Sequence, residues 1–278
     1  MQGKRKYMTV RKDARGLPPA ERFKFARHRF YAAIGYQRRA RLQLRDVDGY
    51  CQIVAPDGSM FRVSPANWRR YKRGLAARLD GLDTQYFFTA LAPPPGPVLD
   101  VGAHAGEFSL LALNDGRTVY AVEPDPDALA CLRRNLAGKD SLTVIDALIW
   151  NAEEELTFSL SASLADSSVF GADNPEMATG TVRRRATTLD RIAEDYGIDA
   201  LAFLKCDAEG AEPEALEGGR ELLRRTARIA IDTGPERKGS RTSDACEALL
   251  RDAGFAVRTR ERGRIVTYGS RGPGDLPG

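Results

Sequence analysis

Short apolar runs alternate with stretches of helical periodicity from residue 98 onward. The apolar runs predict strands, and the stretches between them carry apolar residues at the three- and four-residue spacing of a helix. The expected strands are residues 98–102, 118–123, 142–146, 201–207 and 229–232. The expected helices are residues 108–113, 127–136, 189–196, 213–225 and 243–253. Repeated alternation of strand and helix favours an α/β fold with a mostly parallel sheet covered on both faces.

Two further pairs of apolar runs predict antiparallel strands. Residues 156–160 and 182–187 form one expected pair. Residues 256–260 and 264–268 alternate like a hairpin, which we expect to close one edge of the sheet. Residues 272–278 are rich in glycine and proline and are expected to form a flexible tail.

The first part of the chain has a different pattern. Helical periodicity covers residues 19–41, and the runs 50–54 and 60–63 flank a turn signal, which predicts a β-hairpin. Two more helices are expected at 68–78 and 84–91. The proline-rich segment 93–97 cannot continue a helix. We therefore expect a smaller α+β region over residues 1–91 and a larger domain over 92–271.

Composition limits the class of protein. The chain has 278 residues, 42% of them hydrophobic, which is enough for a substantial core. The sequence has no apolar run as long as that of a signal peptide, and no apolar run of the roughly 20 residues that a membrane span needs. A cytoplasmic protein is therefore expected. The four cysteines are widely separated, which favours reduced thiols over a zinc site or a disulfide framework.

The net charge of +4 conceals two parts of opposite sign. Residues 1–90 hold 20 lysines and arginines against 7 aspartates and glutamates, whereas the remainder holds 22 against 31. In residues 22–45 the arginines are interleaved with aromatic and aliphatic residues, which is typical of a basic amphipathic segment. Its partner could be an anionic glycan, a lipid carrier, a membrane surface or nucleic acid, or the segment could be a solvated face or a face docked on the acidic part.

A glycine-rich turn follows the first expected strand of the larger domain. Its spacing is Asp100-x-Gly102-x-x-x-Gly106, and Glu123 ends the next expected strand. Glycines allow the backbone to approach a ligand closely, and a strand-end carboxylate can accept the hydrogen bonds of a ribose diol. The turn lacks the glycine pattern of a pyrophosphate site, which favours S-adenosylmethionine over a dinucleotide.

Carboxylates recur at the ends of the expected strands, where ligands of open parallel sheets bind. They are Asp100, Glu123, Asp146, Asp207 and Asp232. Asp146 with Ala147 is a candidate neighbour of the adenine ring, and the alternative for Asp146 is a structural cap.

The segment 204–212 contains Lys205, Asp207, Glu209, Gly210 and Glu212. Alternate residues of a strand face the same side of the sheet, so Lys205 and Asp207 could both contribute to one functional site. The structural alternative is a lysine–aspartate ion pair followed by a helix start that favours Glu209 and Glu212.

Together these motifs resemble the FkbM-type family of S-adenosylmethionine-dependent methyltransferases. The resemblance covers about residues 98–231 and is most specific in the Lys205-x-Asp207-x-Glu209-Gly210-x-Glu212 block. It implies a Rossmann-like class I methyltransferase sheet of seven strands, methyl transfer to a hydroxyl oxygen, and cofactor contacts at Gly102 and Glu123. Two departures from the family pattern are His104, where members usually carry asparagine, and Asp232, where many carry glutamate.

The expected site follows from these residues. Asp207 is the first candidate for the base that activates a hydroxyl, with Lys205 and His104 as further catalytic candidates and Glu209 behind them. Cofactor contacts are expected from Asp100, Gly102, Gly106, Glu123, Asp146 and Ala147. No metal is expected, although Asp207 and Asp232 could hold Mg²⁺. The polar segment 163–171 is expected to form a loop over the cofactor.

The favoured function is O-methylation of a saccharide, a glycan or a glycosylated natural product. One alternative is a nucleic-acid methyltransferase that uses the basic region. The other is a cofactor-binding protein with different chemistry. The sequence leaves open whether the protein forms a homodimer.

Overall fold

A computed structural model describes residues 19–33, 43–47, 50–54, 58, 60–162, 166–171, 175–261, 263–271 and 276. The chain divides into two compact units, Met1–Asp80 and Gly81–Gly278. This division lies earlier than the domain boundary expected near residue 92, because Leu82, Tyr86, Phe88 and Leu91 pack into a core of the second unit. The roles assigned to the two expected domains remain predictions.

The described residues of the first unit begin with a helix and a small antiparallel sheet. The helix is α1 (Pro19–Ala33), and the strands are β1 (Gln43–Val47), β2 (Tyr50–Val54) and β3 (Met60–Val63), in the order β1-β2-β3. The hairpin predicted at 50–54 and 60–63 is confirmed by the pairing of β2 with β3. The described helix ends at Ala33, and the rest of the predicted span 34–41 lies outside the described residues.

The helices predicted at 68–78 and 84–91 are wrong in their bounds. A 3-10 helix, η3 (Trp68–Tyr71), is followed by α2 (Leu75–Tyr86). Gly74 has a φ of 95° and separates the two helices, and Phe87, with a φ of 53°, leaves the helical conformation and ends α2. The positive φ at a phenylalanine could not be inferred from the pattern of apolar residues.

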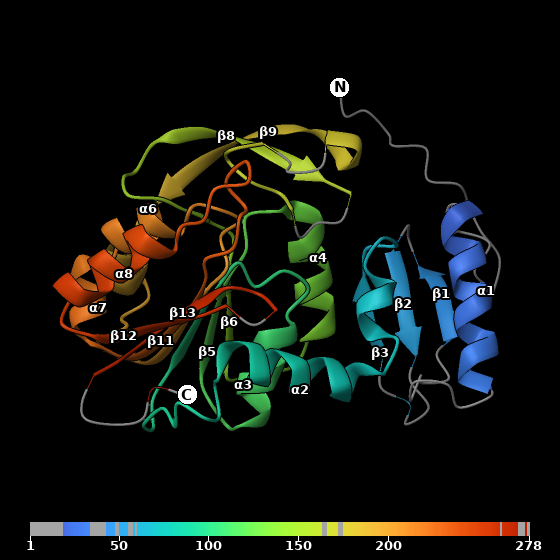
Figure 1. The fold of residues 1–278 in the computed structure, drawn as a ribbon, viewed down its shortest axis with the longest axis horizontal. Coiled ribbons are helices and arrows are strands. Elements are labelled where there is room, and N and C mark those ends of the chain that lie inside the picture. Colours follow the sequence, from blue (N-terminus) through green and yellow to red (C-terminus); the bar gives the residue numbers. More distant parts are fainter. Residues whose placement is uncertain are drawn as a thin grey trace. The chain divides into compact units, whose positions relative to one another are not determined.

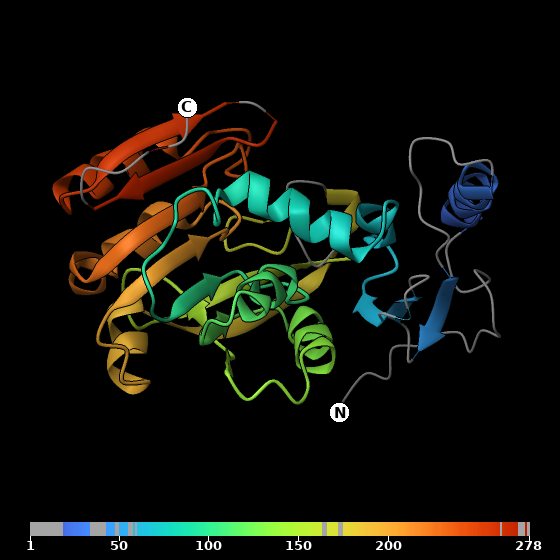
Figure 2. The same cartoon turned by 90° about the horizontal axis from the view of Figure 1, so that it is seen from below.

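The second unit contains a seven-stranded sheet with strand order β12-β13-β11-β10-β4-β5-β6 (Figures 1 and 2). The strands from β11 to β6 pair in parallel, and β13 pairs antiparallel with both neighbours. The strands are β4 (Val98–Val101), β5 (Val119–Val122), β6 (Leu142–Ile145), β10 (Leu201–Cys206), β11 (Thr226–Asp232), β12 (Ala256–Arg260) and β13 (Val266–Ser270). This order, with one antiparallel strand near an edge, is the Rossmann-like sheet that the sequence predicts.

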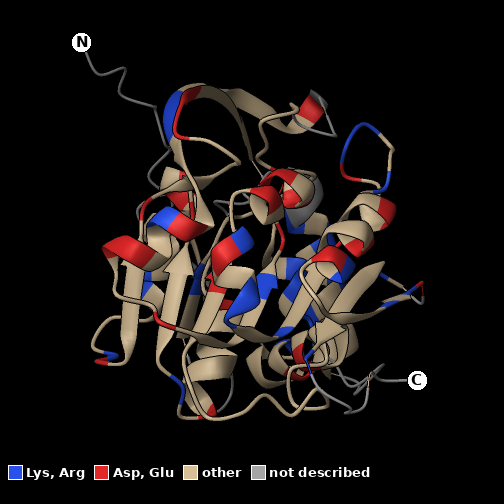
Figure 3. Ribbon diagram, turned by 90° about the vertical axis from the view of Figure 1, so that its left-hand side faces the viewer, with Lys and Arg blue, Asp and Glu red and all other residues tan. Residues whose placement is uncertain are grey.

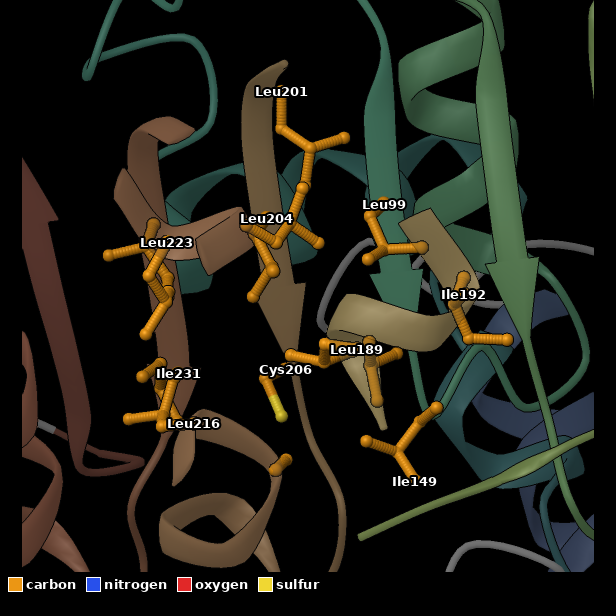
Figure 4. Packing of buried hydrophobic residues seen from close by; sticks show 14 of the residues in the cluster. Leu99, Ile149, Leu189, Ile192, Leu201, Leu204, Cys206, Leu216, Leu223 and Ile231 are labelled. Atoms are coloured by element: carbon orange, nitrogen blue, oxygen red, sulfur yellow. The ribbon is translucent and has the colours of Figure 1, made fainter. Parts of the chain in front are cut away.

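Helices cover both faces of this sheet. They are α3 (Glu107–Asn114), α4 (Pro126–Asn135), α5 (Leu189–Asp195), α6 (Glu212–Glu217), α7 (Arg220–Arg224) and α8 (Ser243–Asp252). One core contains Leu99, Leu204 and Ile231 of the sheet together with α5 to α8. Figure 4 shows these three side chains packed with residues of α5, α6 and α7. The other core contains Val98 and Phe203 of the sheet together with α2, α3 and α4. Successive strand residues therefore face opposite layers, as buried parallel strands require.

Where one helix is predicted over 213–225, the structure contains two, α6 and α7. The break occurs at Gly218 and Gly219. A Cβ on Gly218 would lie 2.3 Å from the carbonyl oxygen of Trp150, so close backbone packing explains both the glycine and the end of α6.

The predicted antiparallel pair at 156–160 and 182–187 is confirmed as β8 (Glu155–Ser161) and β9 (Ala178–Thr187). With the short β7 (Leu148–Ile149) they form a three-stranded sheet, seen at the top of Figure 1, and a 3-10 helix, η4 (Pro175–Met177), precedes β9.

None of the helices described here has the length and apolar character to cross a membrane. In the side view of Figure 3, acidic and basic residues are interspersed along the helices. The predicted tail at 272–278 lies almost entirely outside the described residues.

Candidate functional site

The turn after β4 is joined to two neighbouring strands. The amides of Gly102 and Ala103 both donate to the carbonyl oxygen of Val122 at 3.0 Å, which ties the turn to the end of β5. Gly102 has a φ of 70°, and a Cβ at this position would lie 1.8 Å from the carbonyl oxygen of Asp207. Only glycine fits there, because both the positive φ and the neighbouring backbone exclude a side chain.

The same turn contains a second glycine and the histidine that departs from the family pattern. Gly106 has a φ of 92° and precedes α3, where a Cβ would meet the side chain of Leu136 at 2.9 Å. His104 has a φ of 51°. Asparagine and histidine are among the non-glycine residues that tolerate this left-handed conformation, which explains how His104 can replace the usual asparagine.

Lys205 is hydrogen-bonded to the backbone of this turn. Its Nζ donates to the carbonyl oxygens of Val101 at 3.0 Å and Gly102 at 2.7 Å. It also forms an ion pair with Asp100, 3.1 Å from Oδ1, where the side chains are 5% and 0% exposed. The other Asp100 oxygen accepts a hydrogen bond of 2.6 Å from Ser109. Both groups thus support the turn from within the core, and neither carboxylate oxygen of Asp100 faces solvent.

The charge state of Lys205 argues against a role as base. Burial would lower its pKa, but the carboxylates of Asp100 and Asp207 outweigh burial and raise it above the ordinary value. The ammonium group has three donors and three acceptors within reach, two carbonyls and one carboxylate. It therefore holds its proton in a structural position.

Glu123 lies at the end of β5, beside the turn. Its Oε2 accepts the amide of His104 at 2.6 Å and its Oε1 accepts the amide of Asp125 at 2.8 Å. Burial, with a smaller contribution from Asp125, raises its pKa to about 8. Each oxygen has a second lone pair, so the carboxylate can accept two more hydrogen bonds.

The side chain of His104 is directed at α3. Its Nδ1 lies 3.0 Å from Oε2 of Glu107, a residue that is itself buried. The structure thus places His104 in the turn with its ring held by Glu107, and its backbone amide contacts Glu123.

Asp146 and Ala147 follow β6 at the same edge of the sheet. The side chain of Asp146 is 42% exposed and pairs with Arg184 of β9. Ala147 is partly buried and packs against the core. Either residue can border a ligand held at Glu123, because β5 and β6 are adjacent strands.

Asp207 follows β10 and is held by a residue from a distant part of the chain. The buried hydroxyl of Tyr86, at the end of α2, donates to Asp207 Oδ2 at 2.7 Å. Nη1 of Arg264 lies 3.7 Å from the same oxygen. Burial, followed by the charge of Asp207, raises the pKa of Tyr86 well above its usual value, so the phenol stays a proton donor in this pair.

Arg264 is surrounded by carboxylates. It pairs with Asp232 at the end of β11 and lies 3.2 Å from Oε1 of Glu236. Burial and the nearby charge of Asp207 raise the pKa of Asp232 to about 6 and that of Glu236 to about 10. The raised pKa favours the protonated form of Glu236, which reduces the repulsion within the cluster.

Asp207, Glu209 and Glu236 each offer an oxygen within 4.8 Å of the others. Burial, together with the charges of Asp207 and Glu236, raises the pKa of Glu209 well above its usual value. Asp232, the second expected metal ligand, is not in this group and instead faces Arg264 and Gln85, whose amide lies 3.3 Å from Oδ2.

The described part of the predicted loop, residues 166–171, contacts both the segment beside Glu123 and the segment that contains Glu209. Ser167 donates to Asp125, next to Glu123, at 2.7 Å, and Ser168 donates to the carbonyl oxygen of Glu209 at 2.8 Å. The guanidinium of Arg237 stacks over Phe170, 4.2 Å from its ring centre, and donates to the carbonyl oxygen of Gly210. Residues 163–165 lie outside the described part.

Sequence reasoning missed Gln85, Tyr86 and Arg264 and gave Glu236 no role. Tyr86 and Gln85 belong to a helix whose pattern indicates only packing. Arg264 is the first residue of the edge strand expected over 264–268, whereas the observed strand begins at Val266. No local signal distinguishes these residues, because they reach the site only through the sheet order. Glu212 Oε1 accepts the amides of Ala208 and Gly210 in the turn before α6.

The chain is similar to several known methyltransferases. A 2-O-methyltransferase, NoeI from Sinorhizobium fredii (strain NBRC 101917 / NGR234), is 22% identical over 174 residues, and the match covers 57% of this chain and 72% of that protein. The methyltransferase sdnD from Sordaria araneosa is 28% identical over 202 residues, and the match covers 61% of this chain and 77% of that protein.

Among solved structures, an O-methyltransferase family protein from Burkholderia thailandensis matches with a TM-score of 0.43 and 14% identity, covering 77% of this chain and 64% of that chain. Magnesium protoporphyrin IX methyltransferase from Synechocystis PCC 6803, solved with bound S-adenosylmethionine, matches with a TM-score of 0.40 and 15% identity, covering 70% and 79%. The model of the methyltransferase FkbM domain matches residues 100–257, more than half of the chain. The chain belongs to the FkbM methyltransferase family.

Proposed function

We propose that this methyltransferase uses S-adenosylmethionine to methylate a hydroxyl group of a saccharide, a glycan or a glycosylated natural product. The observation that carries the proposal is the position of Asp207, held by Tyr86 at the same sheet edge as the Gly102 turn and Glu123. A relative of the chain is named a 2-O-methyltransferase, which supports an oxygen acceptor.

The residues present fit the nucleoside part of this cofactor. Glu123 keeps a lone pair on each oxygen for a ribose hydroxyl, and the Gly102 turn beside it carries no side chain. We infer that Glu123, Gly102 and Gly106 hold the cofactor, with Asp146 and Ala147 beside the adenine ring. Asp100 acts through the turn by pairing with Lys205. When bound, the cofactor supplies an activated methyl group.

Asp207 is the proposed base. A sugar hydroxyl is a weak nucleophile at neutral pH, and a carboxylate within hydrogen-bond distance accepts its proton as the new bond forms. The hydroxyl of Tyr86 fixes the orientation of the Asp207 carboxylate, and Arg264 supplies a positive charge beside it. Lys205 and His104 act as positioning residues in this proposal, because Lys205 holds the turn and the amide of His104 holds Glu123.

The raised pKa of Glu123 predicts that cofactor affinity increases with pH. A carboxyl with a pKa of about 8 is mostly protonated at neutral pH, whereas ribose hydroxyls are best accepted by the carboxylate. The affinity for S-adenosylhomocysteine should therefore rise by up to about tenfold per pH unit below the pKa and level off above it. Titration calorimetry across this range measures the effect.

Glu123→Gln removes the titrating group. It should weaken binding by about 1–3 kcal/mol at high pH and abolish the pH dependence. A pH dependence that persists in this variant would place the titrating group elsewhere.

We expect chelation of divalent metals to leave turnover unchanged. Arg264 already provides a cation to Asp207 and Asp232, so the proposed chemistry needs no Mg²⁺. Turnover measured with and without excess EDTA tests this, and a loss of activity that Mg²⁺ restores would assign the metal to Asp207, Glu209 and Glu236 instead.

The acceptor class is tested with isotopically labelled S-adenosylmethionine. The full chain is incubated with a panel of neutral sugars, amino sugars, uronic acids and glycosylated aglycones, with RNA and DNA as a second class. Mass spectrometry and methylation linkage analysis locate the label. Transfer to a sugar oxygen supports the proposal, and transfer only to a nucleic acid, or to none of these acceptors, contradicts it.

A further inference from the structure

Helix α1 of the first unit has one buried face and, opposite to it, an exposed face that carries aromatic side chains. One face is buried and contains Phe25, His28 and Ala32. The rings of Phe25 and Trp68 pack edge to face, with their centres 5.1 Å apart. The ring centre of His28 lies 5.5 Å from that of Trp68. This face fixes the rotation of α1 about its own axis.

The opposite face exposes two phenylalanines. Phe23 is 72% exposed and Phe30 is 62% exposed. They are seven residues apart, so they lie about 10 Å apart along the helix and point nearly 180° away from the centre of the buried face. A basic segment of this kind is expected to direct its charges outward, but here the outermost side chains are aromatic.

Arginines lie on both sides of this aromatic pair. Arg27 lies one helical turn after Phe23, on one side of the aromatic pair. Arg22 and Arg29 lie on the other side of the pair. All three arginines are exposed. Within the described residues, neither Arg27 nor Arg29 forms an ion pair. The described side chains of α1, residues 22–33, include no acidic residue. The first unit as a whole holds 20 lysines and arginines against 6 aspartates and glutamates.

We propose that this face of α1, formed by Phe23, Phe30, Arg22, Arg27 and Arg29, binds the surface of a bilayer that contains anionic lipids. Aromatic side chains with flanking cations are the composition of helices that lie in the lipid interface, where rings enter the acyl boundary and arginines contact headgroup phosphates. This surface would bring the enzyme to acceptors held at a membrane. The proposal is independent of the acceptor assigned above.

Two other partners are disfavoured by the same observations. A second copy of the chain would place two strongly basic units face to face, with repulsion between them. Nucleic acid would satisfy the arginines, but two phenylalanines at the outermost position of a convex helix form no groove for a phosphate backbone.

The test is sedimentation of the full chain with vesicles of phosphatidylcholine alone and of phosphatidylcholine with phosphatidylglycerol. Wild type should bind the anionic vesicles at least about tenfold more tightly. Phe23→Ser with Phe30→Ser should reduce this binding by about tenfold or more, and each of Arg27→Gln and Arg29→Gln by about fivefold. Met60→Ser is the matched control, because Met60 is 58% exposed in the same unit and lies outside the proposed face.

Circular dichroism and cofactor binding should be unchanged in all four variants, since the substituted side chains are exposed and lie outside the site. Equal binding to both kinds of vesicle would overturn the proposal, as would vesicle binding that the phenylalanine pair does not affect. Sedimentation velocity without lipid and competition with single-stranded RNA complete the experiment. Self-association that the double variant abolishes would assign the face to a second copy, and RNA binding that depends on the phenylalanines would assign it to nucleic acid.

Discussion

Lys205→Met is expected to lower the free energy of unfolding by about 3–5 kcal/mol. The substitution leaves the buried carboxylate of Asp100 without its counterion and leaves the carbonyls of Val101 and Gly102 without their donor. Because these groups form the turn beside Glu123, the affinity for S-adenosylhomocysteine should fall as well. Urea unfolding followed by circular dichroism measures the first effect, and titration calorimetry measures the second.

A second substitution distinguishes a charge effect from lost packing. Asp100→Asn combined with Lys205→Met removes both charges, so the double variant should be more stable than the sum of the single effects predicts. Arg191→Met is the matched control, because Arg191 is half exposed and pairs with Asp195 at the surface. It should change the stability by no more than about 0.5–1 kcal/mol. Equal effects at Lys205 and Arg191 would show that the buried ion pair does not stabilise the turn.

Asp207→Asn should reduce kcat by about 10²–10⁴-fold and leave cofactor affinity nearly unchanged. The amide can still accept the hydrogen bond from Tyr86, so the local structure should be retained, but it cannot accept the proton of an acceptor hydroxyl. Steady-state kinetics with an acceptor that the labelling panel reveals, together with calorimetry, separates the two effects. A comparable loss of cofactor affinity would place Asp207 at the cofactor.

Tyr86→Phe tests the positioning role. It removes only the hydroxyl that orients Asp207, so kcat should fall less than in Asp207→Asn. Asp195→Asn serves as the control, because Asp195 is a half-exposed aspartate at the end of α5. Its kinetics should match those of wild type.

The central sheet could be predicted because its strands are short buried runs that end at turns. The parallel strands β4, β5, β6 and β10 agree with the predicted runs to within about one residue at each end, and the family pattern implied the number of strands. Helix ends were less predictable, since α2 ends at a phenylalanine with positive φ and the break between α6 and α7 comes from the approach of Gly218 to the backbone at Trp150. These ends depend on tertiary contacts that no local pattern contains.

The candidate site was predictable where it lies on strand ends. Asp100, Glu123, Asp207 and Asp232 follow parallel strands, and the sheet order gathers them at one edge. What each residue contacts could not be inferred. Asp100 and Lys205 are buried against each other beneath the turn, and Tyr86 and Arg264 reach Asp207 from elements 121 and 57 residues away in the sequence. Their approach depends on how α2 and the β12–β13 hairpin pack.

A crystal structure of the full chain with S-adenosylhomocysteine tests the central assignment most directly. The ribose hydroxyls should lie within hydrogen-bond distance of Glu123, with the sulfur on the side of the ligand that faces Asp207. A ribose bound away from Glu123, or a sulfur directed away from Asp207, would contradict both the cofactor site and the identity of the base.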